Sequence, residues 1–119
     1  VSRILAACGP RFAVWTGNDA LTVPAIALGA SGVISVTANL FPERVQAMAA
    51  AALDGDLDTA AALSLSLTPL NGLLFRETNP IPVKAALELL GFDCGQCRLP
   101  LTGPAEETLA GLKAALPEL

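Results

Sequence analysis

The segment that most constrains the fold is residues 29–39, which has the sequence GASGVISVTAN. Its centre, Val33 to Val36, is a short apolar run rich in β-branched residues, which predicts a buried β-strand. A polar turn comes next, and Pro42 and Glu43 then mark the start of a helix, with proline at the first helical position. Strand, turn and helix are the repeating unit of an α/β fold, in which ligands bind at the carboxyl ends of the strands.

A second unit of this kind precedes the first. Residues 12–16 (FAVWT) predict another strand, and residues 20–28 predict the helix that joins the two strands. Asp19 is the expected N-cap of that helix, and Pro24 should bend the helix or confine its regular part to the residues after the proline. Because parallel strands joined by one crossover helix are usually neighbours, we expect both strands to end on the same edge of the sheet.

Two further helices flank these units. Residues 1–8 are apolar and end at Gly9 and Pro10, as a helix does when glycine follows its last turn and proline prevents continuation. No capping residue precedes this helix, so we expect the chain to begin inside an element. Residues 42–53 carry apolar side chains at helical spacing and are followed by the helix-stopping residues 54–56 (DGD).

The second half of the chain is predicted to be helical. Residues 57–75 contain an alternating Leu-Ser run that is also typical of a strand, but the length of the segment and its alanines favour a helix, which Pro69 should kink. Asn79 predicts the N-cap of a helix that ends at Gly91. Residues 104–107 (PAEE) should begin the last helix.

Four motifs in this chain resemble those of the dihydrodipicolinate synthase family, which belongs to the pyruvate-dependent Schiff-base lyases and aldolases. They are WTGND (15–19), GVISVTAN (32–39), NPIPVK (79–84) and RLPL (98–101). The resemblance covers the whole chain but only the last portion of the family's length. It implies an α/β fold that comprises the last two βα units of a (β/α)8 TIM barrel, from the end of helix 6 to helix 8, in residues 1–54. A C-terminal α-helical region should follow in residues 55–119.

The resemblance also implies an activity, the condensation of pyruvate with aspartate semialdehyde in lysine and diaminopimelate biosynthesis. In this family a barrel lysine forms an imine with pyruvate, which acts as the electron sink, and a tyrosine relays protons, so no cofactor is expected. This chain has no tyrosine, and neither Lys84 nor Lys113 matches the family's nucleophile. We therefore expect no catalytic residue here and no activity of the chain alone. Lys84 should pair with Glu88 one helical turn later.

Five residues are expected to bind substrate. By resemblance, Ile34 presents its backbone carbonyl to the bound keto acid, although a strand isoleucine is a core residue by default. Gly17, Asn18 and Asp19 end the preceding strand on the same rim, where they could bind the second substrate. For Asp19 a purely capping role is an equal alternative. For Asn79 the cap is the first expectation, and a ligand contact is the alternative.

Two other functions stay open. Residues 35–39 (SVTAN) are closer to the synthase pattern than to N-acetylneuraminate lyase, whose matching stretch is GSTYN. Another aldolase of the superfamily, of the N-acetylneuraminate or keto-deoxy-sugar type, is nevertheless an alternative. A non-catalytic helical interaction module is another. In the full-length enzyme the resemblance implies a homo-oligomer, a tetramer or a dimer.

The composition argues against several classes of protein. Hydrophobic residues make up 53% of the chain and charged residues only 15%, which favours a part of a larger body or an oligomer over a free-standing small domain. The net charge of −4 and the scattered basic residues argue against nucleic-acid binding. Polar residues interrupt every apolar run before it could span a bilayer, and no signal peptide is evident, so we expect a cytoplasmic protein.

Cys94 and Cys97 form a CGQC pair in a predicted loop. The sequence contains only one further cysteine, Cys8, and no histidine, so a zinc site with four ligands cannot be completed. We therefore expect reduced thiols and no metal.

Overall fold

The computed structural model describes residues 1–9 and 11–118, and its backbone is mostly helical. The chain divides into two compact units, Val1–Leu67 and Thr68–Leu119. The predicted role of Pro10 in closing the first helix lies outside the described residues. The proposed boundary between a barrel part, residues 1–54, and a helical region, residues 55–119, stays a prediction.

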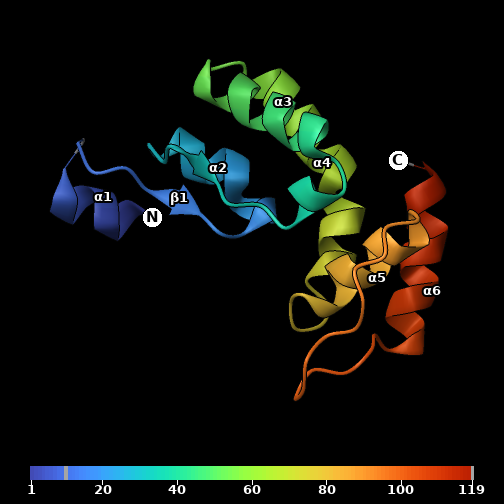
Figure 1. Ribbon diagram of the computed structural model, residues 1–119. Helices are drawn as coiled ribbons and strands as arrows, with labels where there is room; N and C mark the ends of the chain where they lie inside the picture. The colour runs from blue at the N-terminus through green and yellow to red at the C-terminus, as the bar shows by residue number, and fades with distance from the viewer. Residues whose placement is uncertain (10, 119) are drawn as a thin grey trace. The chain divides into compact units, whose positions relative to one another are not determined.

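The first unit contains a parallel strand pair flanked by helices (Figure 1). Strands β1 and β2 pair with Trp15 opposite Gly32 and Thr16 opposite Val33, which confirms the predicted parallel arrangement. The elements of this unit are α1 (Ser2–Cys8), β1 (Trp15–Thr16), the 3-10 turn η1 (Asp19–Leu21), α2 (Thr22–Ala27), β2 (Gly32–Val33), the 3-10 turn η2 (Thr37–Asn39), α3 (Pro42–Leu53) and the first part of α4 (Leu57–Leu74).

Both strands are shorter than predicted. Hydrogen bonds from Ser31 N to Val14 O (2.7 Å) and from Ile34 N to Thr16 O (2.8 Å) extend the ladder by one residue at either end. The prediction of a strand from Val33 to Val36 is wrong after Val33. The reason is that the Val36 N–H donates to a side chain, that of Asp19, instead of continuing the ladder.

The connection between the strands also begins differently from the prediction. Asn18, not Asp19, caps it, because the Asn18 Oδ1 accepts a hydrogen bond from Ala20 N at 3.0 Å. The turn η1 comes first and α2 follows from Thr22. Pro24 therefore lies in the first turn of α2, where a missing N–H leaves no intrahelical bond unmade.

Helix α2 packs against α3 in the first unit (Figure 1). The core clusters of this unit join residues of α2, α3 and the first part of α4. Helix α3 has the predicted bounds, with proline at its first position. Met48 is 1% exposed and stands at the centre of a cluster with Val45 and Leu67. A second cluster joins Ile26, Ala52 and Ala60. These contacts hold the connection between the strands against the helix that follows β2.

The second unit is helical. It contains the remainder of α4, then α5 (Ile81–Leu89), a long loop, α6 (Glu106–Ala115) and the 3-10 turn η3 (Leu116–Glu118). Helix α4 confirms the predicted helix, with Pro69 inside it. Helix α5 packs against α6, and an ion pair between Arg76 and Glu107 joins the end of α4 to α6. The Glu77 carboxylate accepts a hydrogen bond from Ala105 N (3.1 Å), just before α6 begins.

Two predictions about α5 are wrong. Its N-cap position is Pro80, so Asn79 stands one residue too early to cap the helix. Lys84 does not pair with Glu88, because its Nζ donates to the carbonyl oxygen of Gln96 at 3.1 Å. The loop after α5 folds back far enough to offer that carbonyl.

The loop between α5 and α6 carries Cys94 and Cys97. Both thiols are free and half-buried in this structure. Among residues 1–9 and 11–118, no group of three or more His, Cys, Asp or Glu side chains could hold a metal ion. The helices of the same residues include none that combines the length and the apolar character needed to cross a membrane.

Candidate functional site

The candidate site lies at the carboxyl ends of β1 and β2. Because the strands are parallel, the residues that follow them emerge at the same edge of the sheet. The structure therefore brings together four of the five predicted site residues, Gly17, Asn18 and Asp19 after β1 and Ile34 after β2. Asn79 is exposed and lies in the second unit, in the segment before α5.

Asp19 is a buried link between the two strand ends. The residue is only 1% exposed, and its carboxylate accepts hydrogen bonds from the Ser35 hydroxyl and from Val36 N, the latter at 3.0 Å. Its own carbonyl oxygen accepts from the Thr22 hydroxyl at 2.8 Å. The Asp19 carboxylate is thus occupied by donors from the neighbouring strand's turn.

Ser35 is a member of this site that the sequence analysis missed. Its hydroxyl donates to Asp19 and accepts a hydrogen bond from Ala38 N at 2.8 Å. A serine whose hydroxyl accepts from the N–H three residues later is a common way to start a helical turn. The sequence signal that could have identified Ser35 is a serine just before a turn, since η2 begins two residues after it.

The backbone N–H of Ile34 is hydrogen-bonded, whereas its carbonyl accepts from no backbone N–H among the described residues. Its N–H donates to Thr16 O at 2.8 Å, and the next donor along the parallel ladder would be the N–H of Asn18, two residues further on. That N–H instead donates to the Thr16 hydroxyl at 3.2 Å. Within the described residues no backbone donor reaches the Ile34 carbonyl at the strand end.

The side chain of Ile34 is 74% exposed in this structure. Within these 119 residues Ile34 belongs to neither of the buried clusters of the first unit. The neighbouring strand residue, Val33, does pack against the cluster around Met48. Of the two, Val33 serves the core and Ile34 faces outward at the site.

Asn18 and Gly17 present polar groups and open backbone at the same edge. The Asn18 Oδ1 is used by Ala20 N, whereas no described residue accepts from its Nδ2 amide group. Asn18 is exposed, so this amide is available to an acceptor from outside. A Cβ built on Gly17 would contact nothing within 4 Å, which shows that the space over its backbone is open.

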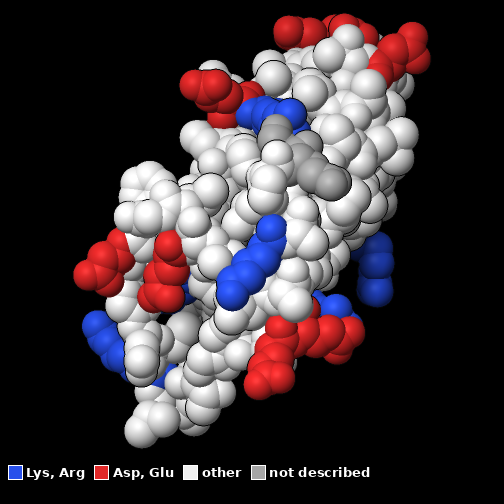
Figure 2. Space-filling model, turned by 90° about the vertical axis from the view of Figure 1, so that its right-hand side faces the viewer, with Lys and Arg blue, Asp and Glu red and all other residues white. Residues whose placement is uncertain are grey.

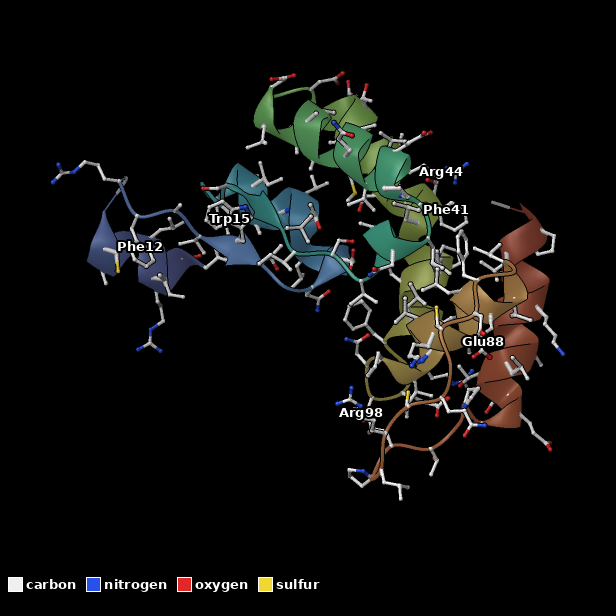
Figure 3. The ribbon with its side chains drawn as sticks, in the orientation of Figure 1. Phe12, Trp15, Phe41, Arg44, Glu88 and Arg98 are labelled. Atoms are coloured by element: carbon white, nitrogen blue, oxygen red, sulfur yellow. The ribbon has the colours of Figure 1, made fainter. Side chains whose placement is uncertain are left out.

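A cleft of about 440 Å³ adjoins β2 in the first unit. Trp15, Gly32, Val33 and Ser35 line it from the strand side, and α3 lines it from the other. Trp15 packs closely on Gly32, where an added Cβ would lie 3.3 Å from the indole ring (Figure 3). The lining is mostly apolar, and its polar group nearest the strand ends is the Ser35 hydroxyl.

Charged side chains are sparse on the face drawn in Figure 2, where the acidic and basic residues stand in small separate groups. At the start of α3 the guanidinium carbon of Arg44 lies 6.0 Å from the centre of the Phe41 ring, and both residues are labelled in Figure 3.

The fold and the site together define a class. A parallel strand–helix–strand unit with polar side chains at its carboxyl edge is typical of α/β proteins, which bind ligands at that edge. Residues 1–119 match the model of the dihydrodipicolinate synthetase family over their whole length, and the chain belongs to that family. The family resemblance noted in the sequence is thereby confirmed.

Curated relatives and solved structures agree with this assignment. The chain is 46% identical over 116 residues to the 4-hydroxy-tetrahydrodipicolinate synthase of Acetivibrio thermocellus, and the match covers 98% of this chain and 40% of the relative. It is 49% identical over 116 residues to that of Thermomicrobium roseum, with 98% and 38% covered. The crystal structure of dihydrodipicolinate synthase from Aquifex aeolicus matches with a TM-score of 0.94 at 44% identity, covering 98% of this chain and 40% of that one.

The chain spans about 40% of the length of the curated relatives that it matches. The related solved structures are dihydrodipicolinate synthases, which are TIM-barrel enzymes, and the mostly helical structure with a two-stranded sheet is consistent with a part of such a barrel.

Proposed function

We propose that this chain forms one side of the substrate pocket in a pyruvate-dependent Schiff-base lyase that condenses pyruvate with aspartate semialdehyde. Its family and its relatives, named 4-hydroxy-tetrahydrodipicolinate synthases, support this activity. The observation that carries the proposal is the carbonyl of Ile34 at the carboxyl end of β2, which no backbone donor reaches within the described residues. The family resemblance assigns to that carbonyl a place facing the bound keto acid.

The other rim residues have distinct proposed roles. The free amide of Asn18 can donate a hydrogen bond to a carboxylate or carbonyl oxygen of the second substrate. Gly17 lets that substrate approach the backbone closely, because it has no side chain in the open space above it. Asp19 is buried, and its proposed role is to hold Ser35 and Val36 by hydrogen bonds and not to contact the substrate. Asn79, which is exposed and does not cap α5, is a further proposed substrate contact.

The proposal places the nucleophile outside this chain. Lys84 donates to the Gln96 carbonyl in the second unit, and Lys113 is exposed in the last turn of α6. The sequence has no tyrosine to relay protons. We infer that the imine forms on a lysine in the part of the enzyme that these 119 residues do not include, in a homo-oligomer that needs no cofactor.

Two chimeras test the proposal. The segment of the Acetivibrio thermocellus synthase that matches this chain is replaced by residues 1–119, and the same exchange is made in the Thermomicrobium roseum synthase. We expect a folded chimera to consume pyruvate in the presence of aspartate semialdehyde. The unaltered host enzymes serve as controls. Two hosts are used because the junction between the segments could prevent folding in one of them.

Two results would contradict the proposal. Folded chimeras that both fail to condense pyruvate with aspartate semialdehyde would show that this rim does not serve that reaction. Turnover with N-acetylmannosamine or glyceraldehyde in place of aspartate semialdehyde would favour an aldolase of the sugar type.

A further inference from the structure

We propose that Asp19 is a positioning residue that fixes the direction of the Ile34 carbonyl and thereby sets the affinity for the keto acid. The inference rests on the proposed function, because it assigns a role within the same pocket. Asp19 itself does not touch the keto acid in this proposal. It acts through Ser35 and Val36, which directly follow Ile34 in the chain.

The first step is that Asp19 is itself held in place. Its carbonyl oxygen accepts from the Thr22 hydroxyl at 2.8 Å, and Asn18 caps the turn in which it lies. At 1% exposure its carboxylate is screened from water. A carboxylate without water needs donors from the protein, and here they come from the segment after the other strand.

The second step is that this carboxylate immobilises Ser35. One oxygen accepts from the Ser35 hydroxyl and the other from Val36 N, the amide that follows Ser35. The Ser35 hydroxyl is in turn fixed by the N–H of Ala38. Because one bond is made by the hydroxyl of Ser35 and the other by the next backbone amide, the pair restrains both the side chain and the backbone of Ser35.

The third step concerns the peptide group that carries the Ile34 carbonyl. It lies between two fixed points, the Ile34 N–H bonded to Thr16 O on one side and Ser35 bonded to Asp19 on the other. The carbonyl itself has no backbone donor among the described residues to hold it. The direction of the carbonyl therefore depends on these two hydrogen bonds. The bond to Thr16 belongs to the strand ladder, and the bond to Asp19 does not.

The kinetic test uses Asp19→Asn and Ser35→Ala in an active chimera. We expect Asp19→Asn to raise the KM for pyruvate about tenfold, as for a weakened bond to a charged group, with the KM for the aldehyde unchanged. Ser35→Ala should have a smaller effect, because the Val36 amide keeps its bond to the carboxylate. Borohydride trapping counts the active sites, and their number should not fall.

Asp56→Asn is the matched control. This carboxylate also accepts a backbone N–H, that of Thr59 at 3.1 Å, but at the start of α4 and away from the strand ends. We expect its KM values to equal those of the parent chimera. If Asp19→Asn leaves the KM for pyruvate unchanged, raises both KM values equally or only lowers the number of active sites, Asp19 does not position the carbonyl.

Amide hydrogen exchange provides a readout that does not need activity. In the folded chimera, Asp19→Ala should speed exchange at Val36 about tenfold or more, while the Ile34 amide, bonded to Thr16, stays protected. Unchanged exchange at Val36 would overturn the inference. A folded but inactive chimera would instead count against the proposed function, and exchange at Val36 would still decide whether Asp19 fixes the segment.

Discussion

In the proposed pocket Ile34 contributes its backbone carbonyl, and its side chain is 74% exposed in this structure. In an active chimera, Ile34→Val should therefore leave the KM for pyruvate nearly unchanged. Ser35→Pro should lower turnover strongly, because a proline ring restrains the preceding residue, which is Ile34 itself. Steady-state kinetics with varied pyruvate measure both effects. A large pyruvate defect in the valine variant would mean that the side chain binds the keto acid.

Gly32 is a residue at which both the backbone conformation and the packing disfavour a side chain. Its φ is +151°, and an added Cβ would lie 3.3 Å from the Trp15 ring. Gly32→Ala should lower the free energy of unfolding by about 1–3 kcal/mol, because it combines backbone strain with crowding. Urea denaturation of an active chimera measures it. Gly103→Ala, where a Cβ would contact nothing, is the control, and an equal loss there would contradict the explanation.

At the scale of elements, Asp56 caps α4 and makes its stability depend on pH. The side-chain and backbone hydrogen bonds from Thr59 lower the pKa of Asp56 below its ordinary value of 3.8. The stabilisation is therefore fully present above pH 3.8 and is lost as the pH falls through the lower pKa of the folded state. Asp56→Ala should lower the unfolding temperature near neutral pH, and the difference from the parent chimera should shrink in acid.

Thermal unfolding of the same chimera between about pH 2 and pH 7 would measure this dependence. Asp54→Ala is the control, because Asp54 is exposed at the end of α3, where a negative charge does not favour the helix. We expect that variant to keep or slightly raise the unfolding temperature. A pH-independent effect of Asp56→Ala would show that the carboxylate does not act as a charged cap.

The helices were largely predictable from the sequence because their signals are local. Pro42 at the first position of α3 and residues 54–56 after its end lie next to the boundaries that they set. The alanines of residues 57–75 likewise outweighed the strand-like alternation, and α4 is a helix. The spacing of apolar residues and the start and stop residues within a few positions determine such helices.

The ends of the strands and the details of the site were not predictable in the same way. Asp19 was expected to cap its own helix, but its carboxylate binds Val36, 17 residues later in the chain. Asn79 was expected to cap α5, which begins two residues later. Local capping rules cannot foresee which donor a buried carboxylate will find once two segments meet. The resemblance predicted which residues at the strand ends belong to the candidate site. Only the structure placed Ser35 beside Asp19.

At the scale of the whole molecule, large apolar side chains remain exposed in each unit. In the first unit they include Phe12, Trp15 and Leu28, each more than half exposed, and in the second Phe92 and Leu99. Because soluble monomers rarely expose this much apolar surface, we expect the 119-residue chain alone to self-associate. Sedimentation velocity over a range of concentrations measures it. A chain that stays monomeric throughout would contradict this expectation.

Trapping of the imine with borohydride tests most directly whether this chain supplies the pocket rim without the nucleophile. The 119-residue chain and a folded chimera are each incubated with pyruvate and borohydride, and each is then analysed by mass spectrometry. We expect the isolated chain to keep its unmodified mass, and the chimera to carry one pyruvyl group on a lysine of the host segment. A stoichiometric adduct at Lys84 in the isolated chain would contradict the assignment of the nucleophile to the rest of the enzyme.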